Sequence, residues 1–163
     1  MPGNSKQGLD KTILILGGAG LVGTQLAHQV ARELRPEKVV IASLYQKEAR
    51  ELAHELRKEF PAVKFAEVWG NMFVRAEFAR EDRADLLASP SRRRALYKDL
   101  FGPLSQAYEQ SMLVQVMREH RPNVLIDSVN TASGISYQDV YTTSIETRKA
   151  LDFFDERVED RDL

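Results

Sequence analysis

The sequence of 163 residues contains no cysteine. Disulfide bonds, thiol catalysis and metal sites with cysteine ligands are therefore excluded. The three histidines, His28, His54 and His120, stand far apart in the sequence, so we expect no histidine-rich metal site either. The composition thus indicates neither thiol nor metal chemistry, and we assign no metal-binding residue.

The sequence also lacks an excess of charge of one sign and lacks long apolar runs. Its 23 basic and 24 acidic residues give a formal net charge of −1, which favours neither nucleic acid nor an anionic membrane as a partner. No stretch approaches the roughly 20 apolar residues that span a bilayer, and residues 1–11 lack the apolar segment of a signal peptide. We therefore expect a soluble, cytoplasmic protein. Its length is that of a single domain, residues 1–163.

Glycine, by contrast, is concentrated at one place. Residues 12–16 (TILIL) form an apolar run without polar alternation, which predicts a parallel strand covered on both faces. Gly17, Gly20 and Gly23 follow at a spacing of three, and the apolar positions from Leu21 to Val30 then recur at helical intervals. The pattern predicts a strand, a tight turn and a helix that begins inside the glycine cluster.

This glycine motif suits a dinucleotide pyrophosphate for a physical reason. The first N–H groups of a helix have no partner within it, and the helix dipole places positive charge at the same end, so an anion binds there favourably. Gly17 would permit the tight turn, Gly20 would let the phosphates approach the backbone, and Gly23 would let the helix pack closely on the strand. The alternative is a glycine-rich turn that serves packing alone, although three glycines in seven residues exceed that need.

The remaining chain predicts further strands and helices in alternation. A second buried strand is expected at residues 38–42, an alternating strand at 62–68 and a fourth strand at 123–129. Amphipathic helices are expected at 46–60 and 104–120. This order predicts an α/β fold, a doubly wound, Rossmann-like three-layer sandwich with a parallel sheet of strand order 3-2-1-4.

Two segments are harder to interpret. Residues 73–102 are rich in charge and predict one or two surface helices, the second with Ser91 as its N-cap. The triple arginine at 92–94 could bind phosphate or nucleic acid, but such runs are more often solvated faces. Near the end of the chain, Thr143 and Glu146 have the spacing of a capping box and predict a last helix.

With these elements placed, the chain resembles the N-terminal part of extended short-chain dehydrogenases/reductases, and most of all the sugar-nucleotide epimerases and dehydratases. The residues that carry the resemblance are ILILGGAGLVG at 13–23, KEARELAHELRKEFP and VKFAEVWGNM at 47–72, and RPNVLIDSVNTAS at 121–133. The resemblance implies a nicotinamide dinucleotide as cofactor and a small-molecule substrate, with nucleotide sugars among the candidates, bound through a C-terminal part that this chain lacks.

The resemblance also implies roles for individual residues. Besides the three glycines, the backbone of Leu21 and Val22 would hold the pyrophosphate. Asn71 stands where the family usually has an aspartate that binds the adenine amino group, and Met72 would lie beside the ring. The ribose on the nicotinamide side would be lined by three consecutive residues, Asn130, Thr131 and Ala132.

Two departures from the family pattern matter. Ser43 occupies the place of the acid that usually binds the adenine ribose, and Lys47 and Arg50 follow, so NADP is mildly preferred to NAD. No tyrosine has a lysine four residues later, so the family's acid/base pair is missing and we assign no catalytic residue.

Three function classes remain open. The chain is the NAD(P)-binding N-terminal portion of a longer oxidoreductase, epimerase or dehydratase, or a stand-alone non-catalytic nucleotide-binding or redox-sensing module, or an interaction domain that has lost the ligand. We expect the first of these. A homodimer is left open.

Overall fold

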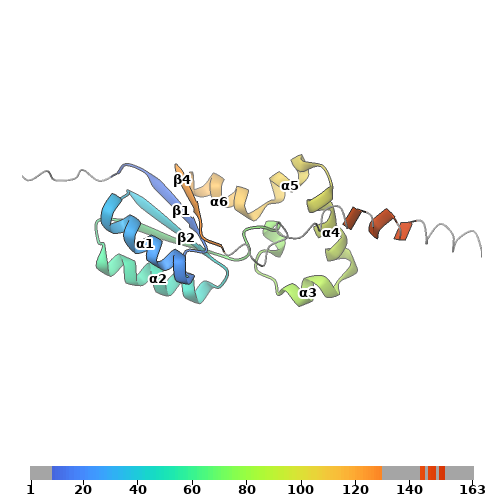
Figure 1. Ribbon diagram of the computed structural model, residues 1–163, viewed down its shortest axis with the longest axis horizontal. Coiled ribbons are helices and arrows are strands. Elements are labelled where there is room, and N and C mark those ends of the chain that lie inside the picture. The colour runs from blue at the N-terminus through green and yellow to red at the C-terminus, as the bar shows by residue number, and fades with distance from the viewer. Residues whose placement is uncertain (1–8, 130–143, 146, 150, 153–163) are drawn as a thin grey trace, which may run out of the picture. The chain divides into compact units, whose positions relative to one another are not determined.

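The computed structural model describes residues 9–129, 144–145, 147–149 and 151–152. By its internal contacts the chain divides into two units, Met1–Val129 and Asn130–Leu163. In the second unit the described residues are helical, and Arg148 Nε lies 2.9 Å from Asp152 Oδ1, one helical turn along. The predicted capping box at Thr143 and Glu146 lies outside the described residues. The structure below is that of the first unit (Figure 1).

The first unit contains a four-stranded, all-parallel sheet in the order β3-β2-β1-β4, as predicted. The strands are β1 (Thr12–Leu16), β2 (Lys38–Ser43), β3 (Lys64–Trp69) and β4 (Val124–Asp127). The first three lie close to their expected positions. β1 and β2 are the continuous apolar runs typical of buried parallel strands, whereas β3 is only partly buried and has an alternating sequence. The fourth is shorter than predicted and ends at Asp127.

Two helices cover one face of the sheet, and a third packs on the other. Helices α1 (Leu21–Leu34) and α2 (Gln46–Glu59) lie on the same side in Figure 1. Their apolar residues form a core with alternate residues of β1 and β2, such as Ile13, Ile15 and Ile41. The residues between these, such as Leu14 and Val40, face the other side and pack against α6 (Met112–His120). The alternation of side chains along each strand therefore produces the three layers of the predicted sandwich.

The connection between β3 and α6, residues 70–111, is longer and more irregular than a simple crossover. It contains a short 3₁₀ helix, η1 (Ala76–Phe78), and three helices, α3 (Arg83–Ala88), α4 (Pro90–Phe101) and α5 (Leu104–Gln110). The second predicted surface helix begins earlier than expected. Ser89, not Ser91, precedes it in extended conformation, because Pro90 suits the first helical position.

The single helix predicted over residues 104–120 is wrong. Ser111 is extended (φ −62°, ψ 131°) and separates α5 from α6. Its hydroxyl accepts a hydrogen bond from the Val114 N–H at 3.4 Å, and the Met112 N–H donates to the Val74 carbonyl at 3.0 Å. Ser111 therefore acts as an N-cap, which the apolar periodicity of this stretch does not reveal.

No helix in the described part of the chain is long and apolar enough to cross a membrane. The same residues contain no group of three or more histidine and acidic side chains that could hold a metal ion.

Candidate nucleotide-binding site

The glycine turn lies at the carboxyl end of β1, next to the start of α1. Gly17 has a φ of +68°, a conformation that favours glycine. A Cβ atom at this position would also come within 3.2 Å of the backbone of Ser128. The turn is closed by the Gly20 N–H, which donates to the Gly17 carbonyl at 2.9 Å. Gly17 thus combines the tight turn with close packing against the end of β4.

Gly23 and Gly20 differ in the space around them. A Cβ atom on Gly23 would overlap the Gly17 carbonyl and would lie 2.7 Å from the Gly18 Cα atom, so α1 can pack this closely on the turn only with glycine there. A Cβ atom on Gly20 meets only the Gly17 carbonyl, at 3.2 Å. The space in front of Gly20 is otherwise open, which is the arrangement that an approaching phosphate requires.

The N-terminus of α1 carries no compensating negative charge. Gly20 precedes the helix without a capping side chain, and no acidic residue lies in the first turn. The backbone of Leu21 and Val22 is predicted to contribute to the site, and these two residues are 88% and 61% exposed. The amide groups and the positive end of the helix dipole are therefore accessible to an anion.

The carboxyl ends of the other strands meet at the same edge of the sheet. Leu16 lies in register with Ala42 on one side and Asp127 on the other. The residue after Asp127, Ser128, donates through its hydroxyl to the Leu16 carbonyl at 2.6 Å. This edge includes the switch point between β1 and β4, where the strand order reverses, and parallel α/β sheets bind ligands at such points.

Ser43, which ends β2, is 6% exposed. Its hydroxyl donates to the carboxylate of Glu48 at 3.3 Å, and its carbonyl accepts from the Gly70 N–H at 2.9 Å. Glu48 is itself exposed in the first turn of α2. The structure therefore brings an acidic group to the end of β2, although the acid belongs to the following helix. The sequence analysis missed Glu48, and the signal that could have found it is an acid in the first helical turn after Ser43.

The two basic residues near this point are directed to other partners. Lys47 lies 3.9 Å from Glu51, one turn along α2. Arg50 lies 3.2 Å from the side-chain oxygen of Gln46 when that amide is oriented to accept from it.

Asn71 and Met72, predicted to bind adenine, are in different environments. Asn71 is exposed, and its side-chain oxygen accepts a hydrogen bond from the Phe73 N–H at 3.0 Å. Met72 is only 5% exposed and packs in the core with Met112 and Val116. The neighbouring exposed side chain is Phe73, at 59%. Met72 thus contributes to the core on the α6 side of the sheet.

The residues predicted to line the second ribose, Asn130, Thr131 and Ala132, lie outside the described residues. The predicted site residues that the structure describes lie at the carboxyl ends of three strands. The glycine turn, with Leu21 and Val22, follows β1, Ser43 ends β2, and Asn71 and Met72 follow β3.

The comparisons with known proteins add little to this geometry. No family model and no curated protein matches the sequence. The solved structure described as "X-ray structure of Pen from Bacillus thuringiensis" matches with a TM-score of 0.40 and 16% sequence identity. The match covers 73% of this chain and 38% of that chain, so this chain spans well under half the length of the structure it matches.

Proposed function

We propose that this chain is the NAD(P)-binding portion of an oxidoreductase, epimerase or dehydratase similar to the extended short-chain dehydrogenases/reductases. The observation that carries the proposal is the glycine turn on a central strand, with open space in front of Gly20 and an uncapped α1 behind it. Such a turn holds a pyrophosphate through backbone N–H groups, so it needs no charged side chain. The proposal includes a cytoplasmic location, because a chain without cysteine has no disulfide bond for an oxidising compartment to form.

The exposed edge of the sheet also supports a longer parent enzyme. Among the described residues β4 is an edge strand, and Val124 and Leu125 are each 41% exposed. Apolar side chains on an edge strand favour association with further structure. Additional strands and a substrate-binding region would cover this edge and complete the crevice beside the glycine turn.

The contacts around Ser43 support NAD rather than NADP, the reverse of the mild preference drawn from the sequence. A carboxylate accepts hydrogen bonds from both hydroxyls of a ribose, whereas it repels a 2′-phosphate. Glu48 places such a carboxylate at the end of β2, while Lys47 and Arg50 have other partners. We therefore propose that Glu48 binds the adenine ribose in place of the acid that Ser43 replaces.

A bound nicotinamide would supply hydride transfer. The residues of this chain would hold the dinucleotide in position. The glycine turn would orient the dinucleotide, and Glu48 would distinguish NAD from NADP. None of the described tyrosines is followed by a lysine four residues later, so proton transfer would depend on a group outside this part of the chain. In isolation the chain should therefore bind cofactor without turning over an alcohol or sugar substrate.

The main test is Gly20→Val, with binding of NAD and NADP measured by titration calorimetry. The valine side chain would project into the space of the phosphates, so binding should be lost while the urea midpoint changes little. Gln25→Val, which adds the same side chain at an exposed position of α1, is the matched control and should bind as the wild type does. Equal affinity in the Gly20→Val and Gln25→Val variants would refute the site. If the wild-type protein binds neither dinucleotide, the result would favour the third function class, an interaction domain that has lost the ligand.

A second test concerns the choice of cofactor. Glu48→Gln keeps the shape and removes the charge, so the affinity for NAD should fall about tenfold, as for loss of one charge-assisted hydrogen bond, while the affinity for NADP is unchanged or rises. Glu51→Gln, one turn away and paired with Lys47, is the control. A parallel loss of affinity for both cofactors would contradict the role of Glu48 without contradicting the glycine turn.

A further inference from the structure

The connection between β3 and α6 contains a segment, residues 83–110, that leaves and rejoins the carboxyl edge of the sheet. We call this segment the cap; it consists of α3, α4 and α5. The chain leaves the sheet after β3, where the Gly70 N–H donates to the Ser43 carbonyl at the end of β2, at 2.9 Å. It returns at Ser111, and α6 then runs back to the opposite edge, where β4 begins. The cap is therefore attached at the same edge that carries the glycine turn.

The two ends of the cap are held close together. Arg75 and Ser111 form an isolated antiparallel β-bridge, and the Met112 N–H donates to the Val74 carbonyl at 3.0 Å. The residues that flank the cap are extended, Asp82 before α3 (φ −67°, ψ 140°) and Ser111 after α5 (φ −62°, ψ 131°). A segment with adjacent ends and a non-helical residue at each end can move as one body, with the change in backbone angles confined to those residues.

The cap shares no hydrophobic core with the sheet. Among the described residues, neither of the two cores on the faces of the sheet contains a residue of the cap. Of the residues in α3, α4 and α5, only Leu86 is buried. A pocket of about 320 Å³, lined by Arg75 and by residues of α4 and α5, also leaves space beside these helices unfilled. Close apolar packing therefore does not fix the cap to the sheet.

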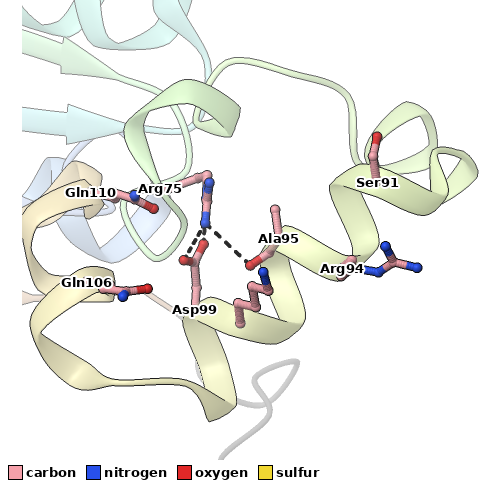
Figure 2. A pocket seen from close by; sticks show the side chains of 8 residues that line it. Arg75, Ser91, Arg94, Ala95, Asp99, Gln106 and Gln110 are labelled. Carbon is pink, nitrogen blue, oxygen red and sulfur yellow. Dashed lines mark hydrogen bonds and ion pairs between the residues drawn. The ribbon is translucent and has the colours of Figure 1, made fainter.

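Ion pairs attach α4 to the segment that precedes the cap. Asp99 accepts two hydrogen bonds from Arg75, at 2.6 and 2.7 Å, and Arg92 lies 2.6 Å from the carboxylate of Glu81. The Ala95 carbonyl also accepts from Arg75, at 3.4 Å, and Figure 2 shows the arginine directed at both partners. Positions 92, 95 and 99 lie on one face of a helix. This face of α4 is therefore held through polar contacts.

A third ion pair joins the cap to α6. Glu109 on α5 accepts two hydrogen bonds from Arg118, each at 2.7 Å. The Arg118 and Glu109 side chains are 51% and 62% exposed, whereas those of Arg75 and Asp99 are only 16% and 18% exposed. Exposed ion pairs contribute little stability, and charge-assisted hydrogen bonds that are shielded from water contribute more. The Arg75–Asp99 pair should therefore be the strongest of the three contacts.

We propose that the cap is a hinged lid at the carboxyl edge of the sheet, and that the Arg75–Asp99 pair is the latch that keeps it closed. Asp82 and Ser111 are the hinges. An interface of ion pairs suits a lid, because opening it exposes little apolar surface to water. The movement itself needs no cofactor. That the lid controls access to a dinucleotide rests on the proposed function.

The absence of cysteine allows spin labels to be attached at chosen positions. Labels at Lys58→Cys on α2 and Leu100→Cys on α4 measure the distance between the sheet and the cap by double electron–electron resonance. Labels at Gln25→Cys on α1 and Lys58→Cys are the reference pair, and all three positions are exposed. The α2–α4 pair should show a main distance and a minor second component from the open lid, whereas the reference pair should show one narrow distance.

The double variant Arg92→Gln/Asp99→Asn removes the two ion pairs of α4. It should raise the ratio of the second component to the first at least about tenfold, as expected for loss of a charge-assisted hydrogen bond. The control, Arg32→Gln/Lys64→Gln, breaks two ion pairs outside the cap and should leave the α2–α4 distances unchanged. With the latch intact, about 1 M NaCl should also raise the second component, because salt screens ion pairs. The salt measurement does not depend on the folding of a latch variant.

Unchanged α2–α4 distances in the folded latch variant would overturn the proposal, and if that variant does not fold, unchanged distances at high salt would do so. A loss of helical circular dichroism in the latch variant would also overturn it, because α4 would then unfold instead of moving with the cap. Saturating NAD should reduce the second component, and binding without this effect would refute control of access by the lid. A lack of NAD binding would contradict the proposed function, and the distances in the latch variant would still decide the movement.

Discussion

The sheet and the β3–α6 connection are stabilised in different ways. β2 is buried along almost its whole length, and the turn after β1 is packed backbone against backbone. In the connection, α4 and α5 contain no buried residue. The contacts of these two helices include ion pairs such as Arg75–Asp99 and Arg92–Glu81. The sheet is therefore stabilised by close packing. Helices α4 and α5 depend more on ion pairs, and each ion pair contributes little stability where it is exposed.

This contrast also bears on the proposed nucleotide site. The proposed nucleotide site would be a backbone site, because glycine N–H groups and the start of α1 would form it on the closely packed turn after β1. Helices α4 and α5, by contrast, have little core of their own. Local opening should be easier there than in the sheet.

The largest effect is expected at the turn. Gly23→Ala places a Cβ atom against the Gly17 carbonyl and 2.7 Å from the Gly18 Cα atom, where backbone would have to move. We expect a loss of about 3 kcal/mol or more in the free energy of unfolding, together with loss of dinucleotide binding. Urea denaturation measures the first quantity. Gly20→Ala, whose Cβ atom meets only the Gly17 carbonyl at 3.2 Å, is the control and should cost far less stability.

Truncation of one leucine in each region tests the comparison directly. Leu14 is fully buried in the core between β1 and α6, and Leu100 on α4 is 56% exposed. Leu14→Ala should lower the free energy of unfolding by about 2–5 kcal/mol, and Leu100→Ala by about 0.5 kcal/mol or less. Chemical denaturation of both variants gives the two values. Similar losses would show that the helices of the connection have a core of their own.

The Arg75–Asp99 pair should be the strongest of the polar contacts of α4, because both side chains are largely buried. A double-mutant cycle with Arg75→Ala and Asp99→Ala should give a coupling energy of about 1–3 kcal/mol. The same cycle on the more exposed Arg118–Glu109 pair should give about 1 kcal/mol or less. Hydrogen exchange should show that loss of Arg75 lowers protection in α4 more than in β1. Equal coupling in the two pairs would contradict the role of burial.

The smallest effect is expected at His120, where α6 meets the sheet. The Lys38 ammonium group lies 3.1 Å from His120 Nδ1, and burial, with the Lys38 charge second, lowers the pKa of His120 below its usual 6.5. The unfolded chain therefore binds a proton that the folded protein does not, so stability falls as the pH drops through about 6.5. His120→Gln should remove this part of the pH dependence, a difference of under about 1 kcal/mol between pH 7.5 and 5.5. Urea midpoints at the two pH values measure it. An unchanged pH dependence in the variant would place the titrating group elsewhere.

The strands, the glycine turn and the strand order were predictable because their signals are local. A buried parallel strand is an apolar run wherever it occurs, and Gly17, Gly20 and Gly23 carry their spacing in the sequence itself. The alternation of strands and helices then leaves few ways to arrange a parallel sheet with right-handed crossovers. These features determine the layers of the protein and the place of the candidate nucleotide site.

Contacts between separate segments decided the rest. The break at Ser111 depends on the bond between Met112 and Val74, and the burial of Met72 depends on how α6 lies on the sheet. Neither is visible in helical periodicity, since an apolar stripe continues through residue 111. Arg75 and Asp99 lie 24 residues apart in the sequence. Charged residues have no periodic signal that identifies their partners, so only the tertiary structure shows that Arg75 pairs with Asp99 and Arg92 with Glu81.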